Sequence, residues 1–388
     1  MIDANWQAVR KVLLIRLDNL GDVLLMTPAF HALKTELPQA SFTLLTSSVG
    51  AQIGRLDPDI DDIILYEAPW IDPWKQLPHD SEREQQMINQ LRQAHFDGAI
   101  IFTSFRQSSL PAAYMCYLAD IPLRVAASVD GPGSLLTTRH KHPEHMMHEV
   151  ERGLDLVGSI GIKTIERDMV LHVPEGDRRT VENFLAREDV TGHPLVVVHP
   201  GCTMPARTYP WEMYVDVINL LIAQVQAFVV ITGGNDEQEL VTRIVEQIQP
   251  AYLNYVLPLA GKLPFAQFCA LMQRADLTIT NNTGPMHVAA AVKTPVIALF
   301  ALTNPPEQWG PWRVEHRLLY HDVSCRICYS RVCPYRHECL RLVSPQMVVD
   351  AAKDLLYAGR RCQLNGNQEP LATSEEDNML QIVHGETL

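Results

Sequence analysis

Short apolar runs separated by helix-like segments are the feature that most limits how this chain can fold. The runs lie at 11–16, 41–46, 63–66, 98–102 and 124–127 and again at 195–199, 228–232, 256–259, 277–280 and 296–300. They lack polar alternation, which is typical of strands covered on both faces. Between the first two runs, apolar residues recur at helical spacing: Val23, Leu24, Met26, Ala29, Phe30 and Leu33. The pattern predicts an α/β protein built from parallel strand–helix–strand units.

The two series of runs predict two domains. The chain has 388 residues, and a domain usually holds roughly 100–200. A polar segment at 173–194 separates the series, so we expect one domain over 1–180 and another over 190–358. From 363 onward the chain has acidic residues, no Lys or Arg and little apolar periodicity. This composition predicts a disordered acidic tail over 363–388.

The charge balance excludes one class of partner. Asp and Glu number 45 against 32 Lys and Arg, giving a net charge of −13. Nucleic acids demand a basic face, so we do not expect DNA or RNA to bind. The N-terminal segment lacks the features of a signal peptide, and no apolar stretch approaches the ~20 residues needed to cross a bilayer. We therefore expect a cytoplasmic protein and leave open a peripheral contact with the inner face of the membrane.

A polar turn follows the first predicted strand. After the run at 11–16 come Asp18 and Asn19, and Gly21 and Asp22 lead into a predicted helix. Ligands in open α/β sheets bind beyond the carboxyl ends of the strands. Asp22 fits two interpretations, a helix N-cap that accepts backbone N–H bonds and a catalytic carboxylate. The turn is not GxGxxG, which argues against a NAD-dependent oxidoreductase.

A second turn lies where the strand at 277–280 ends. Asn282, Thr283 and Gly284 precede Pro285, which we expect at the first position of a small Ala-rich helix carrying His287. Free N–H groups and the positive end of the helix dipole would suit a pyrophosphate there. An ordinary capped helix without a ligand is the competing interpretation.

Two further turns carry residues suited to a nucleotide. Gly201 follows the strand at 195–199 and permits close approach of the backbone to a ligand. Arg207, before the next helix, can pair with a diphosphate through a bidentate contact. Gly233 precedes Asn235 and Glu237, whose side chains can receive ribose hydroxyls. A solvated arginine and a glycine turn with a helix cap are the competing interpretations.

Four cysteines cluster near the end of the second domain. Cys325, Cys328, Cys333 and Cys339 have the spacing C-x2-C-x4-C-x5-C. Four thiols in so short a segment can hold structural Zn²⁺ or an Fe–S cluster, although the spacing is not a common zinc pattern. Disulfides and unligated packed thiols are the other open interpretations.

Taken together, these segments resemble glycosyltransferase family 9, the ADP-heptose:lipopolysaccharide heptosyltransferases. The matching stretches, in order, are IRLDNLGDVLLMTPAFHALK, HEVERGLDLV, VVVHPGC, ARTYPWEMY, VVITGGNDE, PLAGK and TNNTGPMHVAAAVKTPVIALF. They cover most of residues 11–345. The resemblance implies a GT-B fold, in which two Rossmann-like domains with parallel sheets face each other across a cleft.

The resemblance also implies an activity. It implies an inverting, metal-independent transfer of a sugar, a heptose from ADP-heptose, to a hydroxyl of lipopolysaccharide core or a related glycan or glycolipid. The general base of the family falls on Asp22, and the basic residue that faces the leaving diphosphate falls on Arg207. The family's D-T-G turn begins here with Asn282, so an amide replaces a carboxylate. We assign acceptor binding to Arg16 and Asn19, and donor binding to Gly201, Gly233, Asn235, Glu237, Asn282, Thr283, Gly284 and His287.

Two other function classes stay open at this point. One is another GT-B nucleotide-sugar enzyme, an epimerase or hydrolase, which would use the same donor site. The other is a non-catalytic binding protein centred on the cysteine cluster, which the presence of Asp22 disfavours. We expect transfer to need no cofactor, and structural zinc or an Fe–S cluster at the cysteines is the only cofactor that the sequence suggests.

Overall fold

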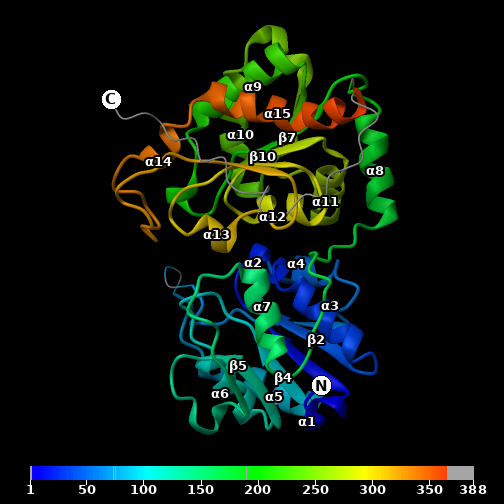
Figure 1. The fold of residues 1–388 in the computed structure, drawn as a ribbon, viewed down its shortest axis with the longest axis vertical. Helices are drawn as coiled ribbons and strands as arrows, with labels where there is room; N and C mark the ends of the chain where they lie inside the picture. Colours follow the sequence, from blue (N-terminus) through cyan, green and yellow to red (C-terminus); the bar gives the residue numbers. More distant parts are fainter. Residues whose placement is uncertain (1, 73, 75, 189, 365–388) are drawn as a thin grey trace. The chain divides into compact units, whose positions relative to one another are not determined.

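The computed structural model describes residues 2–364 except 73, 75 and 189, and it divides into two compact units, Met1–His172 and Val173–Leu388 (Figure 1). The sequence placed the end of the first domain at 180. The division falls earlier because helix α8 (Glu175–Leu185) packs on α11 (Phe265–Arg274), within the second unit. The acidic tail predicted at 363–388 lies outside the described residues, apart from its first two, which end helix α15 (Pro345–Leu364).

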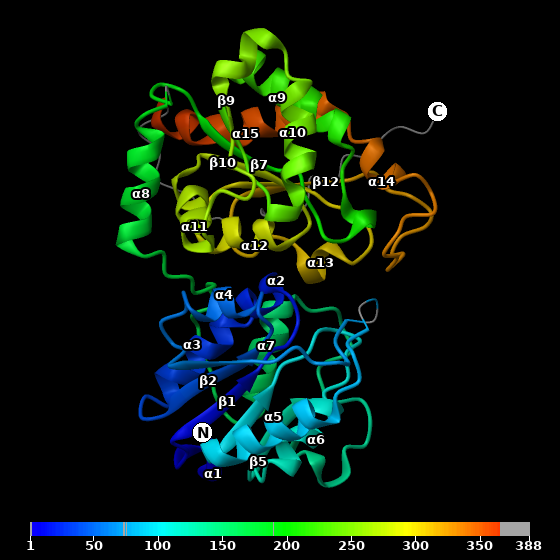
Figure 2. The same cartoon turned by 180° about the vertical axis from the view of Figure 1, so that it is seen from behind.

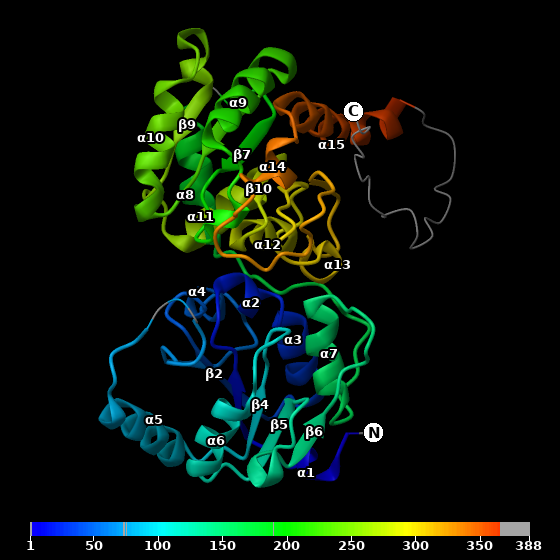
Figure 3. The same ribbon diagram turned by 90° about the vertical axis from the view of Figure 1, so that its left-hand side faces the viewer.

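The first unit is a parallel sheet of six strands in the order β3-β2-β1-β4-β5-β6. Its strands are β1 (Lys11–Ile15), β2 (Ser41–Thr46), β3 (Asp62–Leu65), β4 (Gly98–Ile101), β5 (Leu123–Ala127) and β6 (Thr138–His140). Its helices are α1 (Ala4–Gln7), α2 (Leu20–Leu24), α3 (Thr27–Glu36), α4 (Ala51–Gly54), α5 (Ser81–Ala94), α6 (Leu110–Leu118) and α7 (Glu149–Gly158). Helices α5 and α6 cover one face of the sheet, and α3 and α7 pack together on the other (Figure 3).

The second unit repeats this plan, with the strand order β12-β11-β10-β7-β8-β9. Its strands are β7 (Leu195–His199), β8 (Phe228–Ile231), β9 (Val256–Pro258), β10 (Leu277–Asn281), β11 (Val296–Leu299) and β12 (His316–Leu319). Besides α8, α11 and α15, its helices are α9 (Trp211–Val225), α10 (Gln238–Glu246), α12 (Gly284–Ala291), α13 (Pro306–Trp309) and α14 (Glu338–Arg341). Helices α9 and α15 lie side by side over one face of the sheet (Figure 2).

Burial of the central strands explains why their sequences are continuously apolar. In β1 every residue after Lys11 is buried, and β7 is buried throughout. Leu13 and Ile15 pack with residues of α5 and α6, while Val196 and Val198 pack with residues of α9, α10 and α15. Each core is thus a sheet covered by helices, as the apolar runs predicted. Within the described residues, no helix is both long and apolar enough to cross a membrane.

The helix that the spacing of Val23 to Leu33 predicts between the first two apolar runs is interrupted. Helix α2 ends at Leu24 and α3 begins at Thr27. Pro28 lacks an N–H group and cannot donate to the carbonyl of Leu24, so a continuous helix would leave that carbonyl unpaired. The hydroxyl of Thr27 donates to it instead, at 2.8 Å. The break keeps α2 a short helix that carries the polar turn at the end of β1.

Candidate active site

The topology of each sheet marks one place where a ligand is expected. Strand β1 lies between β2 and β4, and β7 lies between β8 and β10, so the chain winds in opposite directions from these two strands. Open parallel sheets bind ligands beyond the carboxyl ends of the strands at such a switch point. The turns after β1 and β4 in the first unit, and after β7 and β10 in the second, are therefore the candidate sites.

Asp22 lies at the switch point of the first unit. Its Oδ1 accepts hydrogen bonds from Arg16 Nη2 at 3.0 Å and from Ser104 Oγ at 3.1 Å. Its Oδ2 accepts from the backbone N–H of Asn19 at 3.2 Å. Asn19 is the N-cap of α2, so this helix begins at Leu20 and not at Asp22 as expected. The Asp22 side chain keeps 13% of its surface exposed, which leaves its carboxylate within reach of a substrate.

Arg16 contacts the Asp22 carboxylate from the buried side. Its side chain has no exposed surface, its Nε lies 2.9 Å from Asp18 Oδ1, and its Nη2 donates to Ser104 Oγ at 2.6 Å. Burial acts to lower the pKa of Arg16, but the charges of Asp18, Asp22 and Glu149 outweigh it and raise that pKa. A guanidinium without exposed surface does not fit the predicted acceptor contact, and we assign Arg16 a positioning role. Asn19 is exposed beside Asp22, and its acceptor contact stays a prediction.

Asp18 is the other carboxylate of this turn. Burial raises its pKa, the charge of Arg16 acts to lower it, and the charge of Asp22 raises it further. Its Oδ2 lies 3.0 Å from Ser104 Oγ, so Asp18 and Asp22 share the single hydroxyl hydrogen of Ser104. With a side chain only 5% exposed, Asp18 is less accessible than Asp22. Of the two carboxylates, Asp22 is the one placed to meet an acceptor hydroxyl.

Sequence reasoning missed three polar residues of this site. Ser104 follows β4, the strand that pairs with β1, so the adjacency of these strands was the signal that could have found it. Glu149 is fully buried at the start of α7, and Arg152 Nε lies 3.2 Å from its Oε1. Both belong to the stretch HEVERGLDLV, and its place among the stretches that resemble the family was the available signal.

In the second unit, two asparagines tie the switch-point turns together. Asn281 Oδ1 accepts from the Tyr209 N–H at 3.0 Å, and its Nδ2 donates to the Pro200 carbonyl at 2.8 Å. Asn282 Nδ2 donates to Asn304 Oδ1 at 2.9 Å, and its Oδ1 accepts from the Ala301 N–H at 3.1 Å. Asn282 is buried, so its amide joins the turn after β10 to the segment after β11. Its predicted contact with the donor stays a prediction.

The turn after β10 differs in detail from the expected anion site. Gly284 is the first residue of α12 and Pro285 the second. The backbone N–H of Thr283 donates to the Asn281 carbonyl at 2.9 Å, so this group is used inside the turn. The Gly284 N–H and the dipole of α12 are therefore the backbone features of this turn that we retain for an anion. His287 lies buried in the first turn of α12.

Arg207 lies close to this turn. Its Nε donates to Thr303 Oγ1 at 2.9 Å, which links it to the segment after β11. Burial raises the pKa of the nearby Cys202 thiol, while the charge of Arg207 and a hydrogen bond with the Thr283 side chain act to lower it. Arg207 and Thr283 therefore both lie beside Cys202, which brings the turns after β7 and β10 together. Sequence reasoning proposed Arg207 and Thr283 but missed Cys202 and Thr303.

Glu237 is the half-buried one of the two acidic residues in the turn after β8, and Asp236 is exposed. Its Oε2 accepts from the Gly234 N–H at 2.7 Å and lies 3.4 Å from His199 Nε2. Burial acts to raise the pKa of Glu237, but the hydrogen bond and charge of His199 outweigh it and hold that pKa below its usual range. An ionised carboxylate can accept hydrogen bonds from ribose hydroxyls. Asn235 is exposed in the same turn, and both donor contacts stay predictions.

The two glycines predicted to admit a ligand make room for Glu237. A Cβ at Gly201 would lie 1.8 Å from Glu237 Oε1, and one at Gly233 would lie 3.1 Å from Glu237 Cβ. The space beside Gly201 is therefore filled by a carboxylate of the protein. The absence of a side chain at these glycines lets the Glu237 carboxylate lie here, so a ligand bound beside them would contact this carboxylate.

The cysteine cluster lies in the loop between β12 and α14 and at α14 itself. Cys325, Cys328, Cys333 and Cys339 are all free thiols in the structure. In the part of the chain that the structure describes, no three of their sulfur atoms lie within 4.8 Å of one another. Cys333 Sγ accepts from the backbone N–H of His337 at 3.2 Å. A structural metal at this cluster stays a prediction.

Comparisons with known proteins find similarity to one family of glycosyltransferases. The family model described as "Glycosyltransferase family 9 (heptosyltransferase)" matches residues 85–338. The chain is 24% identical over 340 residues to lipooligosaccharide heptosyltransferase 2 of Campylobacter jejuni, which covers 87% of this chain and 95% of that protein. It is 27% identical over 294 residues to lipopolysaccharide heptosyltransferase 3 of Escherichia coli K12, with 75% and 82% covered.

A solved structure shows the same fold. The structure of E. coli ADP-heptose lps heptosyltransferase II superposes with a TM-score of 0.73 at 22% sequence identity, covering 90% of this chain and 99% of that one. The likeness confirms the predicted GT-B architecture of two Rossmann-like units, each with a parallel sheet.

Proposed function

The chain belongs to glycosyltransferase family 9 and is therefore a glycosyltransferase, and from this premise we propose that it transfers a heptose from ADP-heptose to a hydroxyl of lipopolysaccharide core or a related glycan, with inversion at the anomeric carbon. The relatives named heptosyltransferases support the sugar and the acceptor class, and the E. coli structure described as an ADP-heptose enzyme supports the nucleotide. The acceptor would place the enzyme at the inner face of the membrane, as a peripheral protein.

The observation that carries the chemistry is the position of the Asp22 carboxylate. It lies at the switch point of the first sheet, partly exposed, and three donors fix its two oxygens. An acceptor hydroxyl within hydrogen-bond reach would give its proton to this carboxylate as the new C–O bond forms. A positioned general base contributes roughly 10²–10⁴-fold to the rate.

The second unit supplies groups for the leaving diphosphate. As the acceptor oxygen attacks the anomeric carbon, the bond from that carbon to the diphosphate oxygen breaks, and its electron pair leaves with ADP. The Arg207 guanidinium and the Gly284 N–H at the start of α12 are the donors that we assign to this growing charge. Donors fixed before the reaction stabilise the transition state more than the ground state. We propose that these groups allow transfer without a metal ion.

The remaining polar groups of the second unit orient the nucleotide. We propose that Glu237, held ionised beside His199, accepts hydrogen bonds from ribose hydroxyls, and that the exposed Asn235 adds a contact at the same turn. The Gly201 backbone then borders the nucleotide on one side of this carboxylate. These roles place the adenosine near the ends of β7 and β8 and the diphosphate near α12.

A panel of nucleotide sugars tests the proposal. ADP-heptose should raise the melting temperature more than UDP-heptose or ADP-glucose and should be consumed only when a heptose-accepting core glycan is present. The product should carry the anomeric configuration opposite to that of the donor by NMR. Consumption without acceptor would instead indicate a hydrolase, an unchanged anomeric configuration would exclude inversion, and a stronger response to another donor would change the assigned sugar.

A further inference from the structure

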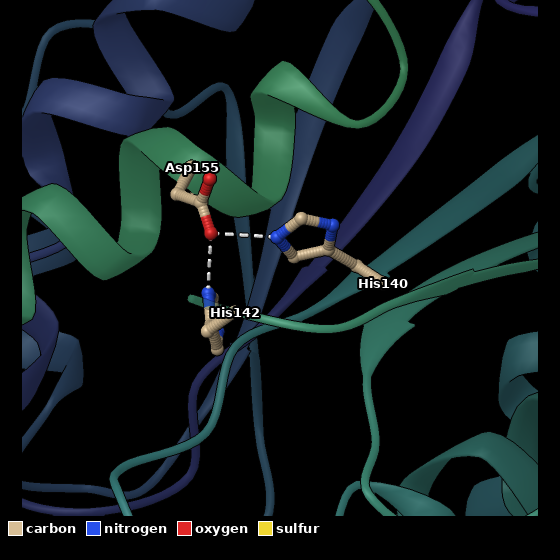
Figure 4. Close-up of side chains that lie close together, drawn as sticks. All are labelled: His140, His142 and Asp155. Carbon is tan, nitrogen blue, oxygen red and sulfur yellow. Dashed lines mark hydrogen bonds and ion pairs between the residues drawn. The ribbon is translucent and has the colours of Figure 1, made fainter. Parts of the chain in front are cut away.

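Two histidines and an aspartate converge at the edge of the first unit's sheet (Figure 4). His140 Nε2 lies 2.6 Å from Asp155 Oδ2, and His142 Nδ1 lies 2.7 Å from the same oxygen. One ligand atom from each residue lies within 4.8 Å of the other two, and this is the only such group of three found among the described residues. None of these side chains has a role in the transfer proposed above.

We propose that His140, His142 and Asp155 form a binding site for a divalent transition-metal ion of the Zn²⁺ class. Imidazole nitrogens suit zinc, copper, iron and nickel, whereas Mg²⁺ and Ca²⁺ prefer oxygen ligands alone. Three protein ligands leave at least one coordination position for water. The side chains are 18%, 11% and 27% exposed, so an ion can enter from solvent while the ligands stay fixed.

Regular structure presets the positions of two of the three ligands, and His142 lies in the loop two residues after the end of β6. His140 ends β6, where it pairs with Ala127 of β5, and its carbonyl accepts from the Ser128 N–H at 3.1 Å. Asp155 lies on α7, which packs on α3. The two imidazole rings meet edge to face, with an interplanar angle of 85°. Ligands held on a strand and a helix lose little conformational freedom when an ion binds.

A carboxylate offsets the charge of the arginine that acts on this group. Arg152, one turn before Asp155, is a basic residue whose charge acts on His142. Arg152 lies 3.2 Å from Glu149, which is fully buried, so a carboxylate offsets its charge. His142, Glu149 and Arg152 also line a cavity of about 10 Å³, which is enough for roughly one water molecule.

Metal binding requires a shift of protons within the two rings. A carboxylate only accepts hydrogen bonds, so without metal each imidazole donates its N–H to Asp155. When the ion binds, His140 carries its proton on Nδ1 and His142 on Nε2, so the ligating nitrogens present lone pairs. The ion replaces both hydrogen bonds and joins the end of β6 to α7. We expect this link to raise the stability of the first unit.

Equilibrium dialysis of the full-length, chelator-stripped protein against micromolar Zn²⁺ tests the site. The wild type should bind one more equivalent than Asp155→Asn and His142→Ala, and its melting temperature should rise with Zn²⁺ but not with Mg²⁺. Asp155→Asn preserves the shape of the side chain, so it decides the question if His142→Ala fails to fold. The matched control is His145→Ala, because His145 is exposed in the same loop. This variant should bind as much metal as the wild type.

The four clustered cysteines require a separate readout, because thiols also bind zinc. With Co²⁺ as the probe, a site of two imidazoles and a carboxylate gives no thiolate-to-cobalt charge-transfer band, whereas the cysteine cluster does. The proposal predicts that Asp155→Asn removes cobalt absorption without changing any such band. It is overturned if the wild type binds no metal, or if both variants keep its full stoichiometry. These outcomes do not depend on transferase activity.

Discussion

Arg16 and Asp22 form an ion pair with a distance of 3.0 Å between Nη2 and Oδ1, at the carboxyl end of the central strand β1. The arginine is buried and the aspartate reaches the surface, so the pair fixes a base from inside the protein. Asp18 and Ser104 complete the arrangement by binding the same guanidinium. A carboxylate held in this way needs little reorganisation when it accepts a proton.

Ser104→Ala tests whether this support matters for catalysis. The hydroxyl lies within hydrogen-bond distance of both Asp18 and Asp22, and a typical hydrogen bond contributes ~0.5–1.5 kcal/mol. We expect kcat to fall roughly 2–13-fold, the equivalent of that free energy, with the donor KM unchanged. Steady-state kinetics measure both values. Ser108→Ala, at an exposed position in the same loop, should behave as the wild type. Equal effects of the two substitutions on kcat would contradict the role of Ser104 in supporting Asp22.

Arg207→Gln tests the assignment of the leaving-group contact. The glutamine keeps a hydrogen-bond donor but loses the charge, so the transition state should lose ~3–4 kcal/mol of stabilisation. We expect kcat/KM to fall by roughly 10²–10³, with weaker binding of ADP measured by calorimetry. The matched control is Arg187→Gln, because Arg187 is exposed near the end of α8. Wild-type ADP affinity and kcat/KM in Arg207→Gln would contradict the assignment.

Asn282→Asp restores the residue that the family resemblance places in this turn. Asn282 donates to Asn304 and accepts from Ala301 within a buried network, and a carboxylate cannot donate. We expect the free energy of unfolding to fall by about 1–3 kcal/mol, because a buried acceptor loses its partner. Urea denaturation measures the change. Asn235→Asp, at an exposed position, should leave stability unchanged. Wild-type stability in Asn282→Asp would show that the amide is not required.

Asp57 gives the first unit a pH-dependent stability. Burial raises the pKa of Asp57 from 3.8 to about 7, while the Asp59 N–H acts to lower it. The folded state holds the Asp57 proton more tightly than the unfolded state does. The contribution of this proton to the free energy of unfolding is therefore complete below pH ~4 and is lost as the pH rises to ~7. Asp57→Asn should therefore raise stability at pH 8 relative to the wild type, by up to roughly 4 kcal/mol. Asp62→Asn, at an exposed carboxylate, should show no such gain.

The central parts of both sheets could be predicted from the sequence because they are buried on both faces. Strands such as β1 and β7 must be apolar throughout, and that pattern is visible without a structure. The edge strands β6 and β12 were missed. Their sequences, TRH and HRLL, belong to strands that are mostly half-buried or exposed, so no continuous apolar run marks them.

The polar framework of the site was harder to predict than its exposed residues. Asp22 and Arg207 follow from their positions at strand ends and from the family resemblance. Asn281, Ser104 and Thr303 bind groups far away in the sequence, at the Pro200 carbonyl, at Asp18 and at Arg207. Such partners depend on the order of strands in the sheet, which local patterns do not encode. For the same reason, the contact between His140 and Asp155 could not be predicted from the sequence.

The most direct test of the account is the turnover of Asp22→Asn with ADP-heptose and a core glycan acceptor, measured beside its affinity for ADP. Asparagine keeps the size of the side chain and an oxygen for the Asn19 N–H, but it cannot take the acceptor's proton. We predict that kcat falls by roughly 10²–10⁴ while the Kd for ADP stays at the wild-type value. Turnover within a few-fold of the wild type would contradict the assignment of Asp22 as the base.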